Sequence, residues 1–135
     1  MEGTKRTILI IDDDSFLLDM YALKFSQSNF SVHTATDGVQ ALEKLRGGLN
    51  PEVILSDIMM PQMDGFEMLQ KINQEKLSPD SVKLVLSNKN DQADIDRGNA
   101  LGVAGYIIKA NSTPTEVIAQ VQDVLSAKVV KQQKQ

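Results

Sequence analysis

A chain of 135 residues of which 41% are hydrophobic is the size of one domain and can bury a core without metal or disulfide staples. It has no cysteine, which excludes a disulfide framework, a thiolate zinc site and a cysteine nucleophile. The net charge of -4 combines both signs without a long basic stripe, so we expect no direct binding of nucleic acid. No apolar run is long enough for a membrane span or a signal-peptide core, so we expect a cytoplasmic protein that does not bind membranes.

Five short apolar runs along the chain are typical of β-strands. They are continuous rather than alternating, which indicates strands buried on both faces of a sheet. In chain order they cover residues 7–11, 30–35, 52–56, 82–87 and 105–109.

Amphipathic stretches between these runs predict five helices, at residues 15–27, 38–45, 64–73, 91–101 and 114–127. Alternation of five strands with five helices predicts a doubly wound α/β fold, in which helices cover both faces of a parallel sheet. Capping signals mark two helix starts, because Asp64 precedes Glu67 by three residues and Thr113 precedes Glu116 by the same spacing. The stretch 91–101 has only Ile95 as a large apolar residue before its end, so we expect it to be the least stable helix.

Polar side chains occupy the ends of four predicted strands, where an open parallel sheet binds its ligands. Carboxylates cluster there, and they would repel one another unless a cation offset their charge. Mg²⁺ prefers a few carboxylates, water and phosphate oxygens, so Asp12 or Asp13 together with Asp57 would bind it. The residues at the four ends are Asp12, Asp13 and Asp14; Ser56 and Asp57; Ser87 and Asn88; and Lys109.

A carboxylate beside Mg²⁺ can act as a nucleophile toward a phosphoryl donor, and Asp57 would have this position. Phosphoryl transfer spreads negative charge over the equatorial oxygens, which Lys109 and the Ser87 hydroxyl would stabilise. Each residue alone has an ordinary structural explanation as a turn, cap or solvated charge. It is the coincidence at all four strand ends that favours phosphoryl chemistry.

The segment 57–66, Asp-Ile-Met-Met-Pro-Gln-Met-Asp-Gly-Phe, resembles the phosphoacceptor segment of two-component response regulators, of the single-domain chemotaxis-regulator type. The strand at 8–11 with its three aspartates, the strand ending in Ser87 and the run 105–109 follow in that family's order. The resemblance covers essentially the whole chain. It implies a flavodoxin-like receiver fold with strand order 2-1-3-4-5 and five helices over residues 6–127, with residues 128–135 as a C-terminal tail or linker stub.

The resemblance also implies the roles of the acidic residues. Asp57 would be the phosphoacceptor, and Asp12, Asp13, Asp57 and the backbone carbonyl of Met59 would hold Mg²⁺. The chain would be a signalling switch that catalyses its own phosphoryl transfer and dephosphorylation, rather than an enzyme with a separate substrate. Its partners would be a sensor histidine kinase or phosphotransfer protein and a downstream protein target. We expect a monomer, with a dimer on phosphorylation as the alternative.

The resemblance further implies roles for three residues in binding the phosphoryl group and in switching. Lys109 would pair with the phosphoryl oxygens, and Ser87 would donate its hydroxyl to the phosphoryl group and move toward it. Tyr106 would then turn inward into the vacated space. The output surface would be formed by the fourth helix, the fifth strand and the fifth helix.

Two positions depart from the family's pattern. Ala110 follows Lys109 where the family generally has a proline in a cis peptide, and a cis bond before a non-proline residue costs roughly 2.5 to 4 kcal/mol. A trans bond and a differently shaped loop are therefore the alternative here. Asn88 is bulkier and more polar than the small residue often found after the switch hydroxyl, which would alter access to the phosphoryl group.

Two other functions compete with a phosphorylated receiver. The strand followed by Asp-x-Asp also resembles haloacid-dehalogenase phosphatases, with Asp12 as nucleophile and Asp14 as acid, but that family's later acidic pair is missing and the segment 57–65 is left unexplained. The other is a degenerate receiver that binds a partner without phosphorylation, which nothing in the sequence favours. The start at Met1 and the end after the last helix favour a stand-alone protein over an excised domain only modestly.

Overall fold

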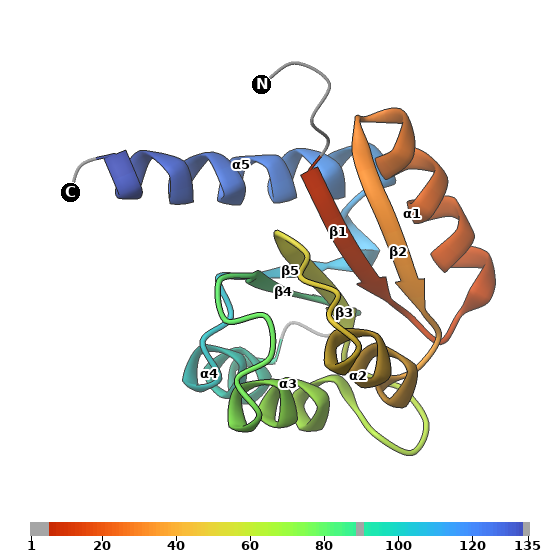
Figure 1. Ribbon diagram of the computed structural model, residues 1–135. Helices are drawn as coiled ribbons and strands as arrows, with labels where there is room; N and C mark the ends of the chain where they lie inside the picture. The colour runs from red at the N-terminus through yellow and green to blue at the C-terminus, as the bar shows by residue number, and fades with distance from the viewer. Residues whose placement is uncertain (1–5, 89–90, 134–135) are drawn as a thin grey trace.

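The computed structural model, which describes residues 6–88 and 91–133, contains one parallel sheet with the strand order β2-β1-β3-β4-β5. Figure 1 shows the sheet between two layers of helices. This is the doubly wound fold and the strand order predicted from the sequence. The strands are β1 (Arg6–Ile11), β2 (Phe30–Ala35), β3 (Val53–Asp57), β4 (Val82–Ser87) and β5 (Gly105–Ile108).

The sheet divides the core into two parts, one on each of its faces. One apolar cluster joins alternate residues of β1, such as Ile8, to α1 and α5, and the other joins residues such as Leu9 to α2 and α3. The helices are α1 (Ser15–Gln27), α2 (Gly38–Arg46), α3 (Gly65–Gln74), α4 (Gln92–Ala100) and α5 (Pro114–Gln133), and a short 3₁₀ helix, η1 (Lys109–Asn111), follows β5. No helix of residues 6–88 and 91–133 is long and apolar enough to cross a membrane.

The parallel register brings the carboxyl ends of the central strands to one edge of the sheet. Ile11 of β1 pairs with Ser56 of β3, and Ser87 of β4 pairs with Ile108 of β5. The residues that follow these strands, or end them, therefore emerge side by side although they are far apart in the sequence.

Both predicted capping boxes are present. The Asp64 side chain accepts a hydrogen bond from Glu67 N at 2.8 Å while the Glu67 side chain accepts one from Asp64 N, and this fixes the start of α3. Thr113 and Glu116 make the same reciprocal pair at the start of α5, with donor–acceptor distances of 2.8 and 3.2 Å.

Some predicted boundaries are wrong. Lys109 does not end β5 but opens η1, because β4, which pairs with β5, ends at Ser87 and offers no further partner. The peptide bond between Lys109 and Ala110 is trans, like every bond of the described residues. The last helix continues past residue 127 to Gln133, since no glycine or proline interrupts it. The limits 6–127 of the predicted domain stay a prediction.

Burial on both faces was predicted for all strands, and it holds only in the middle of the sheet. Every residue of β3 and β4 is buried, whereas most residues of the edge strands β2 and β5 are only half-buried. The helical layers cover the centre of the sheet more completely than its edges. Asp57 thus ends a strand that is buried along its whole length.

Candidate functional site

A polar pocket of about 400 Å³ opens at the carboxyl edge of the sheet. It collects residues from the ends of β1, β3 and β4, from the first turn of α1 and from η1. The predicted site residues Asp12, Asp13, Asp57, Met59, Ser87 and Lys109 all line it, together with Asp14, Leu17 and Asn88.

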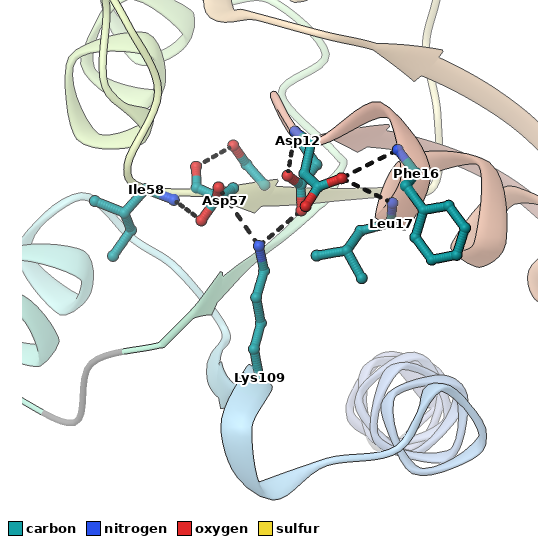
Figure 2. A network of polar contacts seen from close by, with 8 residues as sticks. Asp12, Phe16, Leu17, Asp57, Ile58 and Lys109 are labelled. Carbon is teal, nitrogen blue, oxygen red and sulfur yellow. Dashed lines mark hydrogen bonds and ion pairs between the residues drawn. The ribbon is translucent and has the colours of Figure 1, made fainter.

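Asp12 and Lys109 form a buried ion pair at the centre of the pocket. Lys109 Nζ donates to Asp12 Oδ2 at 2.8 Å and lies 3.5 Å from Asp57 Oδ2, and Figure 2 shows its side chain pointing between the two carboxylates. The other oxygen of Asp12 accepts a hydrogen bond from Asp14 N. The ammonium group of Lys109 therefore balances part of the negative charge of both Asp12 and Asp57.

The backbone around Asp57 is held tightly by α3. Gly65 N donates to Ile58 O at 2.8 Å, and a Cβ atom added at Gly65 would lie only 2.3 Å from Asp57 O. Ile58 N in turn donates to Asp57 Oδ1 at 2.9 Å, which orients the carboxylate and leaves Oδ2 toward Lys109. Glycine at position 65 is thus required by the close approach of α3 to the end of β3.

Burial and the charge of Lys109 shift the pKa of the Asp57 carboxylate in opposite directions. Burial raises the pKa of Asp57, Lys109 lowers it, and the neighbouring charges of Asp12 and Asp13 raise it again, to about 6. Burial alone would lower the pKa of Lys109, but its hydrogen bond to Asp12 and the charge of Asp57 outweigh this and raise it. The pocket therefore holds more negative charge than its single lysine can neutralise.

The acidic residues are suitable ligands for a divalent cation. Asp12, Asp13 and Asp57 each offer a carboxylate oxygen, and these atoms lie within 4.8 Å of one another. Hard oxygen donors of this kind are the ones that Mg²⁺ binds. Burial is the main cause of the raised pKa of Asp57, and the charges of Asp12 and Asp13 add to it, so a bound cation would offset part of this cost.

Ser87 at the end of β4 and Tyr106 of β5 are neighbours. Ser87 is buried at the end of β4 and lines the pocket, whereas Tyr106 does not line it and packs half-buried against the apolar cluster beneath α3. Burial raises the pKa of the Tyr106 phenol and the neighbouring Ser87 hydroxyl partly lowers it, although Tyr106 Oη is buried without a hydrogen bond to the described residues. The predicted roles of both residues in switching stay predictions.

Two further residues that line the pocket, Met59 and Asp14, differ from the acidic cluster in exposure and in hydrogen bonding. Met59 is 62% exposed at the mouth of the pocket, and the role of its backbone carbonyl as a metal ligand stays a prediction. Asp14 caps α1 by accepting hydrogen bonds from Phe16 N and Leu17 N. This cap occupies the carboxylate that the phosphatase alternative needs as an acid.

Sequence reasoning missed three features of the site. The direct pairing of Lys109 with Asp12, 97 residues away, has no local signal in the sequence. Leu17 was not expected in the pocket, although the cap at Asp14 implies that the first turn of α1 faces the end of β1. The tight contact of Gly65 with Asp57 was also not foreseen, and a glycine directly after an N-cap residue is only a weak indication of it.

Comparison with known proteins finds response regulators both among family models and among similar sequences. The family model described as "Response regulator receiver domain" matches residues 8–122. The chain is 33% identical over 120 residues to the alkaline phosphatase synthesis transcriptional regulatory protein PhoP of Bacillus subtilis, an alignment that covers 89% of this chain and 48% of that protein. It is 30% identical over 122 residues to the DNA-binding response regulator MtrA of Mycobacterium tuberculosis, covering 90% and 51%. The chain thus spans about half the length of these relatives.

Solved structures show the same fold. The chemotaxis response regulator CheY4 of Vibrio cholerae superposes with a TM-score of 0.81 at 27% identity and covers 90% of this chain and 99% of its own. The receiver domain of the Francisella response regulator 1452 superposes with a TM-score of 0.80 at 25% identity, covering 92% and 99%.

Proposed function

The chain belongs to the response regulator receiver domain family of two-component systems, and we propose that it is a switch controlled by phosphorylation of Asp57. The observation that carries the proposal is the position of Asp57, whose buried carboxylate lies at the end of β3 with Lys109 Nζ 3.5 Å from Oδ2. Asp12 and Asp13 supply the acidic surroundings.

In the proposed reaction, Asp57 Oδ2 attacks the phosphorus of a phosphohistidine on a sensor kinase or phosphotransfer protein, or of a small acyl phosphate. The new O–P bond forms as the N–P or O–P bond of the donor breaks, and the imidazole or carboxylate leaves. Lys109 stabilises the charge on the transferred oxygens, and Ser87 donates its hydroxyl to one of them. Hydrolysis of the aspartyl phosphate by the same chain would return the switch to its starting state.

Asp12, Asp13 and Asp57, with the backbone carbonyl of Met59, would hold Mg²⁺. The bound ion would supply charge neutralisation for the phosphoryl oxygens. The Asp12 carboxylate is engaged by Lys109, so Lys109 and the bound ion would share this carboxylate.

Phosphorylation would add a charge of about -1.5 to -2 beside Ser87. Movement of Ser87 toward the phosphoryl group and of Tyr106 into the space behind it would then change the surface of α4, β5 and α5, which a downstream protein recognises. Tyr106 Oη, which is buried without a hydrogen bond to the described residues, supports this because its present position has little polar stabilisation. We propose a cytoplasmic monomer that dimerises, if at all, on phosphorylation.

PhoP and MtrA are named as a transcriptional and a DNA-binding regulator, respectively. Our proposal for the present 135 residues is control of a protein partner without direct contact to nucleic acid, since the chain carries a net charge of -4. Titration of a labelled DNA duplex with the phosphorylated chain at low salt checks this, and saturable binding would contradict it.

Intact mass after incubation with acetyl phosphate tests the phosphoacceptor. We expect one phosphoryl adduct that requires Mg²⁺, is labile to hydroxylamine and is absent from Asp57→Asn. Asp37→Asn is a matched control, because Asp37 caps α2 and lies outside the pocket. Its adduct should equal that of the wild type.

Two results would count against the proposal. An adduct that persists in Asp57→Asn would place the acceptor elsewhere, and no adduct with either acetyl phosphate or a phosphorylated histidine donor would indicate a receiver that binds without phosphorylation. Turnover of a phosphate ester that survives Asp57→Asn and is lost in Asp12→Asn would instead support the phosphatase alternative.

A further inference from the structure

The helix α4 rests on a small apolar patch contributed by α3, β5 and the loop between α4 and β5. Gly98 is the only residue of α4 that is fully buried. A Cβ atom added at Gly98 would lie 3.0 Å from Val103 Cγ2, 3.8 Å from Phe66 Cε1 and 4.0 Å from Tyr106 Cδ2. The backbone of α4 therefore lies directly on these three side chains, with little apolar surface of its own to hold it there.

Two side-chain contacts with α3 hold α4 in this place. Arg97 Cζ lies 4.7 Å from the centre of the Phe66 ring, so the guanidinium covers a ring that is otherwise buried. Asn73 Nδ2 donates to Leu101 O at 2.9 Å, at the C-terminal end of α4. Because α4 buries so few apolar side chains, these two contacts contribute much of its attachment.

Phe66 is also connected to the phosphoacceptor. It directly follows Gly65, whose N–H donates to Ile58 O and whose Cα packs against the carbonyl of Asp57. A shift of the backbone at Asp57 must therefore move the first turn of α3, since no space exists between them. The ring beneath Arg97 moves with that turn.

We propose that Arg97 and Phe66 form a latch that couples Asp57 to α4 through α3. This route is separate from Ser87 and Tyr106, and it rests on the proposed function only in that Asp57 is its trigger. While the latch is closed, Arg97 keeps α4 over Phe66 and Tyr106. A displacement of α3 weakens the stacking, which shifts the population toward a released α4.

Hydrogen exchange of the α4 amides in the unphosphorylated full chain, without Mg²⁺, tests the latch. Arg97→Ala should speed this exchange by about two- to five-fold, relative to β1 amides of the same sample. Alanine has the higher helix propensity, so lower propensity cannot explain faster exchange, and the double-mutant cycle below separates the ring contact from the favourable charge of Arg97 in the last turn of α4. Arg46→Ala is the matched control, because Arg46 binds Glu75 between α2 and α3, and it should leave α4 unchanged. Unchanged α4 exchange in Arg97→Ala overturns the latch.

A double-mutant cycle identifies the partner of Arg97. Phe66→Leu keeps an apolar side chain but removes the ring, so Arg97→Ala should have no further effect on α4 exchange in that background. Fully additive effects of the two substitutions would overturn the pairing.

Coupling to Asp57 is tested by adding beryllium fluoride with Mg²⁺, a mimic of the phosphoryl group. We expect faster α4 exchange in the wild type and a response at least about two-fold smaller in Arg97→Ala, in which α4 is already released. An equal response in both proteins overturns the coupling. If the amides around Asp57 also show no response to beryllium fluoride, the proposed function fails, and Asp57 cannot be the trigger of the latch. The exchange of Arg97→Ala without beryllium fluoride still decides whether the latch itself exists.

Discussion

At Asp57, the negative charge is held in the folded chain at a cost in free energy. Its pKa rises from 3.8 to about 6 mainly because the carboxylate is buried, so in this pH range the folded chain retains a proton that the unfolded chain has lost. The stability that this proton contributes is present below about pH 4 and is lost as the pH rises through about 6. The full difference amounts to at most about 3 kcal/mol at pH 7.

Asp57→Asn should therefore be more stable than the wild type at pH 7 without Mg²⁺, by about 1 to 3 kcal/mol, and the advantage should shrink toward pH 4. Urea denaturation of both proteins at several pH values in EDTA measures this. A difference that does not change with pH would show that the substitution acts through packing and not through the charge.

Gly65 has the most restricted environment among the described glycines. Gly65→Ala should lower the free energy of unfolding by about 1 to 3 kcal/mol or more and, under the proposed function, slow phosphorylation, because its Cβ would lie 2.3 Å from Asp57 O and displace Asp57. Urea denaturation and adduct formation with acetyl phosphate provide the two readouts. Gly47→Ala is the control, since Gly47 has a helical φ of -76° and its nearest contact would be 3.3 Å, to Glu43 O. Equal losses in both variants would contradict the steric argument.

At the scale of elements, capping signals in the sequence were reliable because they act within one turn of chain. Asp64 with Glu67 and Thr113 with Glu116 form the reciprocal bonds that their spacing predicts. Strand ends were less predictable, because a strand continues only as far as its neighbour does. Lys109 shows this: its apolar predecessors suggest a longer strand, but β4 ends at Ser87 and the chain turns into η1.

Thr113→Ala should destabilise the chain by about 1 kcal/mol, since it removes the hydroxyl that accepts from Glu116 N at the start of α5. The neighbouring substitution Thr115→Ala, on the exposed first turn, should change the free energy of unfolding by less than about 0.5 kcal/mol. Chemical denaturation compares them, and similar losses for both would mean that the cap carries no stability of its own.

For the whole molecule, the alternation of strands and helices predicts the layers of the fold, and the family resemblance supplies the strand order. The layers were confirmed because the hydrophobic pattern determines which faces are buried, and the strand order is the one that the resemblance implies. The pairing of Asp12 with Lys109 could not be predicted, because it depends on side-chain reach across the finished edge of the sheet. The same holds for the packing of Gly65 on Asp57.

Mg²⁺ should stabilise the folded chain, because the three carboxylates converge only after folding. At a free concentration ten times the dissociation constant, the expected gain is about 1.4 kcal/mol. Thermal or urea denaturation with MgCl₂, against NaCl of equal ionic strength, measures the gain. Asp12→Asn should lose most of it and Asp37→Asn should keep it, whereas an equal gain in both variants would locate the ion outside the pocket.

The ion pair between Lys109 and Asp12 joins positions separated by 97 residues, and Asp57 lies between them in the sequence. A chain emerging from the ribosome presents Asp57 long before Lys109, and at that stage the carboxylate lacks its cationic partner. If Asp57 is the acceptor, as proposed, it becomes competent only when η1 has docked beside the end of β1. Incomplete or misfolded copies, which lack this contact, would then not take up phosphoryl groups in place of finished ones.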